Sequence, residues 1–229
     1  MAKKKDRTEE NITAVEEALS KSEIFIERNQ KILTTIIFVI ILVVLAFFAL
    51  RRFYIEPREK DAQALIYKAE QYFEQDSLQL ALDGDGNYPG FLDIISEYRW
   101  TKTARLANYY AGIIYLEQGE FEEAIRHLKK FKSDDFLVGN MALAAQGDAW
   151  LELDKPDKAA RLYVKAAKNN VNDFATPMFL MKAAMTYEHM GQYQKALNIY
   201  EKIKSQHVDS QEGREAEKYI ARARMMIEK

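Results

Sequence analysis

The longest apolar run in the chain covers nineteen residues, Ile32 to Leu50, with no charged residue, glycine or proline. A helix of this length spans about 30 Å, which matches the hydrocarbon core of a bilayer. Lys31 precedes the run, and Arg51 and Arg52 follow it, so basic side chains stand at both ends. The pattern predicts a helix that crosses a membrane once.

The run is not typical of a cleaved signal peptide, because a long region of mixed charge precedes it and bulky residues follow it. Residues 1–31 carry seven Lys and Arg, against five in residues 51–70. The positive-inside rule therefore gives a small preference for a cytoplasmic N-terminus, although Arg51 and Arg52 argue against it. We expect an uncleaved signal anchor over residues 31–52.

The leader, residues 1–30, contains a second helical pattern. Ile12, Val15, Leu19 and Ile26 recur at helical spacing, and glutamates fill much of the opposite face. This spacing predicts a short amphipathic helix. Its acidic polar face favours a protein partner over anionic lipid, and a marginal helix without a specific role is the alternative.

Beyond the span, residues 107–131, 142–166 and 179–203 superpose on one another with offsets of 35 and 37 residues. Small side chains let two helices approach closely, and the aromatic residues beside them fill the wider gaps. The recurring positions are Gly112, Gly147 and Ala184, then Tyr115, Trp150 and Tyr187, then Ala124, Ala159 and Ala196, and finally Leu128, Tyr163 and Tyr200.

Each repeat therefore consists of two antiparallel helices joined by a turn. Gly119 and Gly191 allow that turn in the first and third repeats, and Asp154 to Pro156 takes this place in the middle one. The predicted fold class is all-α, with one transmembrane helix followed by a helical solenoid. The expected segments are a cytoplasmic leader at 1–30, the anchor at 31–52, a degenerate first helix pair with a loop at 53–100, three repeats at 101–208 and a capping helix at 209–229.

Composition argues against several kinds of chemistry. The chain has no cysteine, and its three histidines, His127, His189 and His207, lack a second ligand at metal-binding spacing. Residues 1–52 hold nine basic and seven acidic residues, which leaves a formal charge of −4 on residues 53–229 out of a total of −2. We expect no catalytic residue, no metal or cofactor, no small-molecule substrate and no nucleic-acid partner.

The repeated small and aromatic positions resemble the tetratricopeptide repeat. In that family the first helix of each pair lines a concave surface, which implies a groove for an extended or helical peptide. The positions that the resemblance places in this groove are Leu106, Tyr109, Ile113, Leu116, Glu117, Met141, Asp148, Leu151, Met178, Met181, Met185, Glu188 and His189.

Three methionines, Met178, Met181 and Met185, share one face of the third repeat. Methionine is flexible and polarisable, so such a face adapts to many apolar segments. The alternative is that these side chains only pack against the capping helix. If they line the groove, aspartate at Met181 and Met185 abolishes crosslinking to clients with little change in thermal unfolding.

The order of leader, anchor and repeat domain is similar to that of the ancillary subunit of the SecYEG translocon, and residues 172–203 resemble its versions in Bacteroidota-type bacteria. The resemblance implies a chaperone-like adaptor in the bacterial inner membrane, with a cytoplasmic N-terminus and periplasmic repeats. Its implied partners are translocon subunits, a periplasmic prolyl isomerase chaperone and newly exported chains.

Two other functions stay open. One is a membrane-tethered scaffold for another envelope machine, such as outer-membrane insertion or cell-wall synthesis. The other is a docking receptor whose repeats face the cytoplasm. Such a receptor usually needs a basic clamp for an acidic peptide terminus, whereas the groove positions include Glu117, Asp148, Glu152 and Glu188.

Overall fold

The structure, a computed structural model, describes residues 28–133, 135–169 and 171–228. These residues are mostly helical, and none of them belongs to a β-strand, which confirms the all-α prediction. The predicted leader helix lies almost wholly outside the described residues. The chain divides into two compact units, Met1–Glu56 and Pro57–Lys229.

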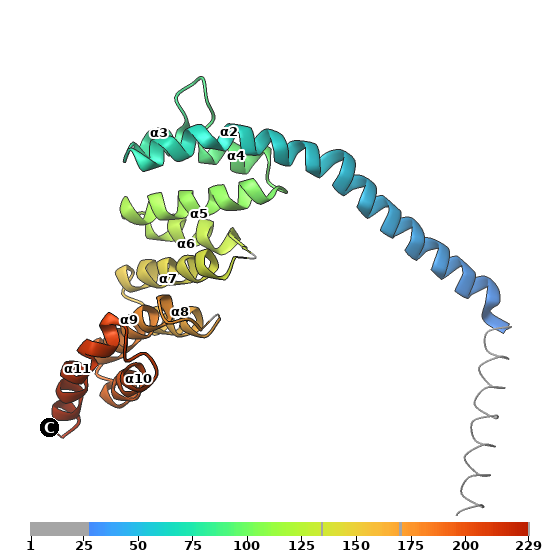
Figure 1. Cartoon of the computed structure of the whole chain (residues 1–229). Coiled ribbons are helices and arrows are strands. Elements are labelled where there is room, and N and C mark those ends of the chain that lie inside the picture. The colour runs from blue at the N-terminus through green and yellow to red at the C-terminus, as the bar shows by residue number, and fades with distance from the viewer. Residues whose placement is uncertain (1–27, 134, 170, 229) are drawn as a thin grey trace, which may run out of the picture. The chain divides into compact units, whose positions relative to one another are not determined.

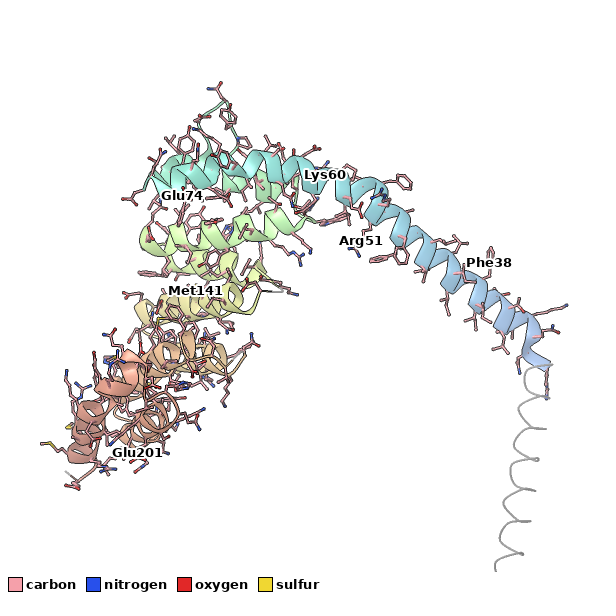
Figure 2. All side chains as sticks on the ribbon, viewed as in Figure 1. Phe38, Arg51, Lys60, Glu74, Met141 and Glu201 are labelled. Carbon is pink, nitrogen blue, oxygen red and sulfur yellow. The ribbon has the colours of Figure 1, made fainter. Side chains whose placement is uncertain are left out.

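In the first unit the apolar run is helical, and the helix that begins at Arg28 continues to Glu74. Its most apolar window has a mean hydropathy of 3.2 and no buried residue. The hydroxyl of Thr35 donates to the backbone oxygen of Lys31 at 2.8 Å, so this polar group is satisfied within the helix. Phe38, labelled in Figure 2, is 62% exposed. This helix is long and apolar enough to cross a membrane, as predicted.

A short π-helix, η1 (Arg51–Ile55), follows the apolar run directly. Arg51, labelled in Figure 2, opens it. The Arg52 guanidinium donates to Glu56 Oε2 at 2.5 Å, one turn further along. Both side chains are well exposed, so this ion pair adds little to the stability of the helix.

The second unit is a stack of helix pairs, in which α5 packs against α6, α7 against α8 and α9 against α10, with α11 covering the last pair (Figure 1). The helices are α2 (Glu56–Glu74), α3 (Leu78–Asp83), α4 (Phe91–Glu97), α5 (Lys102–Glu117), α6 (Phe121–Lys130), α7 (Phe136–Glu152), α8 (Pro156–Asn169), α9 (Ala175–His189), α10 (Tyr193–Gln206) and α11 (Gln211–Ile227).

Backbone conformation at the turns follows the residues available there. Gly119 and Gly191 have φ values of 79° and 70°, and Asp154 has a φ of 55° at the matching turn of the middle pair. A left-handed conformation stops a helix with little strain for glycine, and aspartate tolerates it better than most residues do. The three turns therefore lie where the sequence predicts them.

The close approach of paired helices is visible at the small residues. A Cβ atom on Gly112 would lie 2.6 Å from Leu128 Cγ, and one on Gly147 would lie 2.6 Å from Tyr163 Cε1. Both distances are too short for a normal contact, so a larger side chain would push the two helices of the pair apart. Tyr163 itself is 1% exposed.

One buried histidine makes the stability of the repeats depend on pH. His127 is 3% exposed, its Nδ1 lies 3.0 Å from Asn108 Oδ1, and its Nε2 has no partner among the described atoms. Burial, helped by the charges of Arg126 and Lys130, lowers the pKa of His127 from 6.5 to about 4. The unfolded chain therefore binds more protons than the folded chain between these two values.

We expect the free energy of unfolding to fall as pH falls from 6.5 towards 4, because the unfolded chain gains a proton on His127 that the buried side chain of the folded chain does not take up. The same titration on His127→Leu should lack this part of the slope. Urea unfolding at several pH values measures both. A wild-type slope that the substitution leaves unchanged would contradict the assignment to His127.

Candidate protein-binding groove

Two hollows lie side by side on the repeats and share Met185 and His189. The first has a volume of 440 Å³ and is bounded by α7, α8 and α9, with Leu151 and Tyr163 in its wall. The second has a volume of 500 Å³ and is bounded by α9, α10 and α11, with Tyr219 in its wall. We call the two hollows together the Met185 groove.

Met185 is the apolar centre of this groove. Its side chain is 40% exposed, and it contributes to the lining of both hollows. Met226 of α11 lines the second hollow, so the capping helix forms part of the groove wall. Met185 is therefore available at the surface even though α11 packs beside it.

The Met185 groove gathers only part of the predicted set. The predicted residues that line it are Asp148, Leu151, Met185, Glu188 and His189. The predicted residues Leu106, Tyr109, Ile113 and Leu116 of α5 and Met178 of α9 are partly buried and pack against core clusters. Glu117 and Met141, the latter labelled in Figure 2, are exposed but line neither hollow.

Met181 does not belong to an open surface. It is 8% exposed and is part of the largest core cluster, together with Tyr163, Phe179 and Tyr200. The sequence-based expectation is that an aspartate at Met181 changes thermal unfolding little, whereas from this burial we expect it to destabilise the fold, because the charge would have to be buried. Met185 lies one turn further along α9, and an aspartate at this position is the better test of client crosslinking.

Asp148 is bound on two sides. The Tyr163 hydroxyl donates to its Oδ1 at 2.6 Å, and Lys182 Nζ lies 2.7 Å from Oδ1 and 2.9 Å from Oδ2. Burial, followed by this hydrogen bond to the carboxylate, raises the pKa of Tyr163. The tyrosine is therefore the neutral donor of this hydrogen bond at neutral pH, and the carboxylate is the acceptor.

Glu188 repeats this arrangement in the next repeat. The Tyr200 hydroxyl donates to its Oε2 at 2.9 Å, and Arg222 Nε lies 2.7 Å from Oε1. Its side chain is only 13% exposed. Burial first, and then the Glu188 carboxylate, raises the pKa of Tyr200.

In both cases the carboxylate lies on the first helix of a pair and the tyrosine on the second helix of the same pair. The cation lies on the next helix along the chain, which is α9 for Lys182 and α11 for Arg222. The two carboxylate–cation pairs, Asp148 with Lys182 and Glu188 with Arg222, are each separated by 34 residues. These contacts tie adjacent repeats together and neutralise two of the four acidic residues predicted for the groove. Neither Lys182 nor Arg222 is foreseen by the sequence prediction, although opposite charges one repeat apart are the pattern that would reveal them.

Comparison with protein-family models matches the tetratricopeptide repeat over residues 106–135 and 179–210. These ranges cover most of α5 and all of α6, and most of α9 and all of α10, and the pair α7 and α8 between them also packs together. No curated protein matches the chain. The chain therefore contains tetratricopeptide repeats, which point to a scaffold for protein–protein interaction.

Proposed function

We propose that this protein is a membrane-anchored adaptor that binds an apolar segment of another protein in the Met185 groove. The observation that carries the proposal is the pair of adjoining hollows with an exposed methionine at their junction. A helix long and apolar enough to cross a membrane precedes the repeats in the same chain. Together these features support a groove that is held near a membrane.

The lining of the groove favours apolar side chains in the bound segment. Leu151, Met185 and Met226 offer flexible aliphatic walls, and Tyr219 adds an aromatic face. A methionine-rich wall adjusts to side chains of different shape, which suits a partner of variable sequence. Because Asp148 and Glu188 are already paired with basic residues, the floor of the groove does not demand a basic partner.

Aspartate at Met185 tests this proposal. A photo-crosslinking amino acid at His189, on the shared rim, should capture clients in cells that carry the otherwise normal chain. Met185→Asp should lower this capture by at least about tenfold, since a carboxylate facing an apolar segment loses more than about 1.4 kcal/mol of binding. Immunoblotting of the crosslinked products measures the change.

Met141→Asp is the matched control, because Met141 is 37% exposed on α7 and lines neither hollow. It introduces the same charge on the same kind of residue and should leave the capture at His189 unchanged. Equal capture in Met185→Asp and Met141→Asp cells would show that the groove is not the binding site.

We further propose that the adaptor works at the Sec translocon, with its repeats in the periplasm beside a prolyl isomerase chaperone. The order of leader, anchor and repeats supports this setting through its resemblance to the ancillary translocon subunit. Affinity purification in mild detergent should recover SecY, SecE and SecG. Recovery of a different stable envelope complex in their place would support the alternative scaffold for outer-membrane insertion or cell-wall synthesis.

The docking receptor with cytoplasmic repeats is the second candidate, and one structural observation favours it. Lys182 and Arg222 neutralise Asp148 and Glu188, so the groove is less acidic than its sequence positions indicate. Protease added to spheroplasts separates the two settings. A periplasmic repeat domain is digested, whereas a cytoplasmic one survives until the membrane is broken.

A further inference from the structure

A third hollow adjoins the Met185 groove. It has a volume of 430 Å³ and lies between the turn at Gly191, the start of α10 and the end of α11. It shares Tyr193 and Met226 with the second hollow of the groove. We call this third hollow the end hollow. The surface around Met185 therefore continues towards the end of the capping helix.

The end hollow offers further apolar contacts to a segment that lies in the groove. Met226 forms part of both walls, and Ile227 beside it is 42% exposed. Tyr193, which also lines both hollows, is half-buried. A segment that places an apolar side chain at Met185 can therefore extend across Met226 into the end hollow.

Basic residues outnumber acidic ones around these two hollows. Apart from His189, the titratable acids and bases that line the second hollow and the end hollow are Lys195, Lys218 and Arg222 on the basic side and Glu188 on the acidic side. Glu188 forms an ion pair with Arg222 at 2.7 Å, so it balances one of the three cations. The charges of Lys195 and Lys218 are left over.

Neither of these two lysines forms an ion pair with a described residue. Lys195 Nζ donates to Gln192 Oε1 at 2.8 Å, and this acceptor is neutral. Lys218 Nζ lies 5.3 Å from the centre of the Tyr219 ring. Both lysines are exposed. Each ammonium group can therefore take up a carboxylate of a partner without breaking an existing ion pair.

The other acidic residues of α10 and α11 do not balance the two lysines. Glu201 already pairs with Arg224, and Glu217 already pairs with Lys204. The acidic residues that belong to these helices or directly follow them, and that line neither hollow, are Glu201, Glu212, Glu215, Glu217 and Glu228. Among the described residues, the positive charge at the end of the groove therefore has no acidic counterpart.

The first hollow of the groove differs in this respect, because Asp148 and Lys182 pair with each other there. Positive charge therefore increases along the groove from α7 towards α11. An exposed ion pair strengthens binding roughly twofold to fivefold, so two such pairs are enough to select among apolar segments of similar shape.

We propose that the Met185 groove takes a segment of another protein in which acidic residues stand next to the apolar ones, and that these carboxylates bind Lys195 and Lys218. The inference rests on the proposed function, because it specifies which segments the groove accepts. Lys195 lies on the second helix of its pair and Lys218 on the capping helix. The partner is therefore selected by residues outside the groove positions that the sequence predicts.

Peptide selection on the purified full chain, held in mild detergent, tests this inference. A phage-displayed library of random peptides should yield sequences in which Asp or Glu accompanies large apolar residues. The double variant Lys195→Glu and Lys218→Glu should instead select Lys or Arg beside such residues. The matched control, Lys165→Glu with Lys202→Glu, should keep the acidic preference, because these two exposed lysines line none of the three hollows.

Fluorescence anisotropy measures the size of the effect on one selected peptide. Replacing its acidic residues with glutamine should weaken binding to the wild-type chain about fivefold at low salt. The difference should shrink as the salt concentration rises, because salt screens exposed charges. A difference that high salt leaves unchanged would contradict an ionic contact with the two lysines.

Met185→Asp separates this inference from the proposed function. If the selected peptides are apolar without a charge preference and Met185→Asp abolishes their binding, the proposed function stands and the inference fails. The inference also fails if the double lysine variant selects the same acidic peptides as the wild-type chain. If Met185→Asp binds the selected peptides as the wild-type chain does, or if the wild-type chain selects no peptide, the groove is not a binding site and both fail.

Discussion

Replacing Met181 with aspartate is expected to lower the free energy of unfolding by about 3–5 kcal/mol, because the new carboxylate has no cation to pair with in the core. Met181 is 8% exposed and belongs to the core cluster that contains Tyr163 and Tyr200. Burial raises the pKa of such a carboxyl above its unfolded value, so the loss of stability should shrink as pH falls through that raised value. Urea unfolding at neutral and acidic pH measures both effects.

Two variants separate the burial of charge from other effects of the substitution. Met181→Leu keeps the volume and the apolar character, and should cost less than about 1.5 kcal/mol. Met185→Asp places the same carboxylate on the exposed face of α9, where the cost should be about 0.5 kcal/mol or less. If Met181→Asp were as stable as Met185→Asp, Met181 would have to face the groove, as its position in the repeat predicts.

Replacing Gly213 with alanine is expected to loosen the capping helix and to lower the free energy of unfolding by about 2–3 kcal/mol. A Cβ atom at this position would lie 1.9 Å from the backbone oxygen of His207 and 3.0 Å from Val208 Cα. These are backbone atoms of the loop that leads into α11, so either the loop or the helix must move. Displacing α11 would uncover the core residue Ile220 and separate Arg222 from Glu188.

Gly139→Ala is the matched control, because Gly139 lies near the start of α7 as Gly213 lies near the start of α11. A Cβ atom there meets nothing within 4 Å, so the change should raise stability by about 0.5 kcal/mol through helix propensity. Urea unfolding gives the two free energies, and hydrogen exchange of the α11 amides shows where Gly213→Ala acts. Equal stability of the two variants would mean that the approach of His207 to α11 is not required by the fold.

The repeat architecture is predictable from sequence because its determinants recur. Gly112 and Gly147 mark helix crossings, and Gly119 and Gly191 mark turns, each at a spacing that repeats along the chain. A small side chain where helices touch and a glycine where φ is positive are local requirements. A pattern search detects such requirements without knowing which helices lie next to one another.

The groove is less predictable because its surface depends on partners far away in sequence. In the sequence alone, Asp148 and Glu188 look like unpaired acidic residues. In the folded chain they form ion pairs with Lys182 of α9 and Arg222 of α11. Met181 and Met185 stand one helical turn apart, yet the packing of neighbouring helices buries one and leaves the other exposed. These outcomes follow from the angle between successive pairs, which no single repeat encodes.

The close contacts at Gly112 and Gly147 also indicate which segment of the chain can be duplicated or exchanged as one unit. Gly112 faces Leu128 and Gly147 faces Tyr163, so each small residue is matched to a side chain in the second helix of its own pair. A gene rearrangement that joins sequences within the loops before α5, α7 or α9 keeps these matched partners together. One that joins them at the turns inside the pairs would bring a glycine or alanine against a side chain selected for a different neighbour. Duplication and recombination of this solenoid should therefore be tolerated at one edge of the stack and counter-selected at the other.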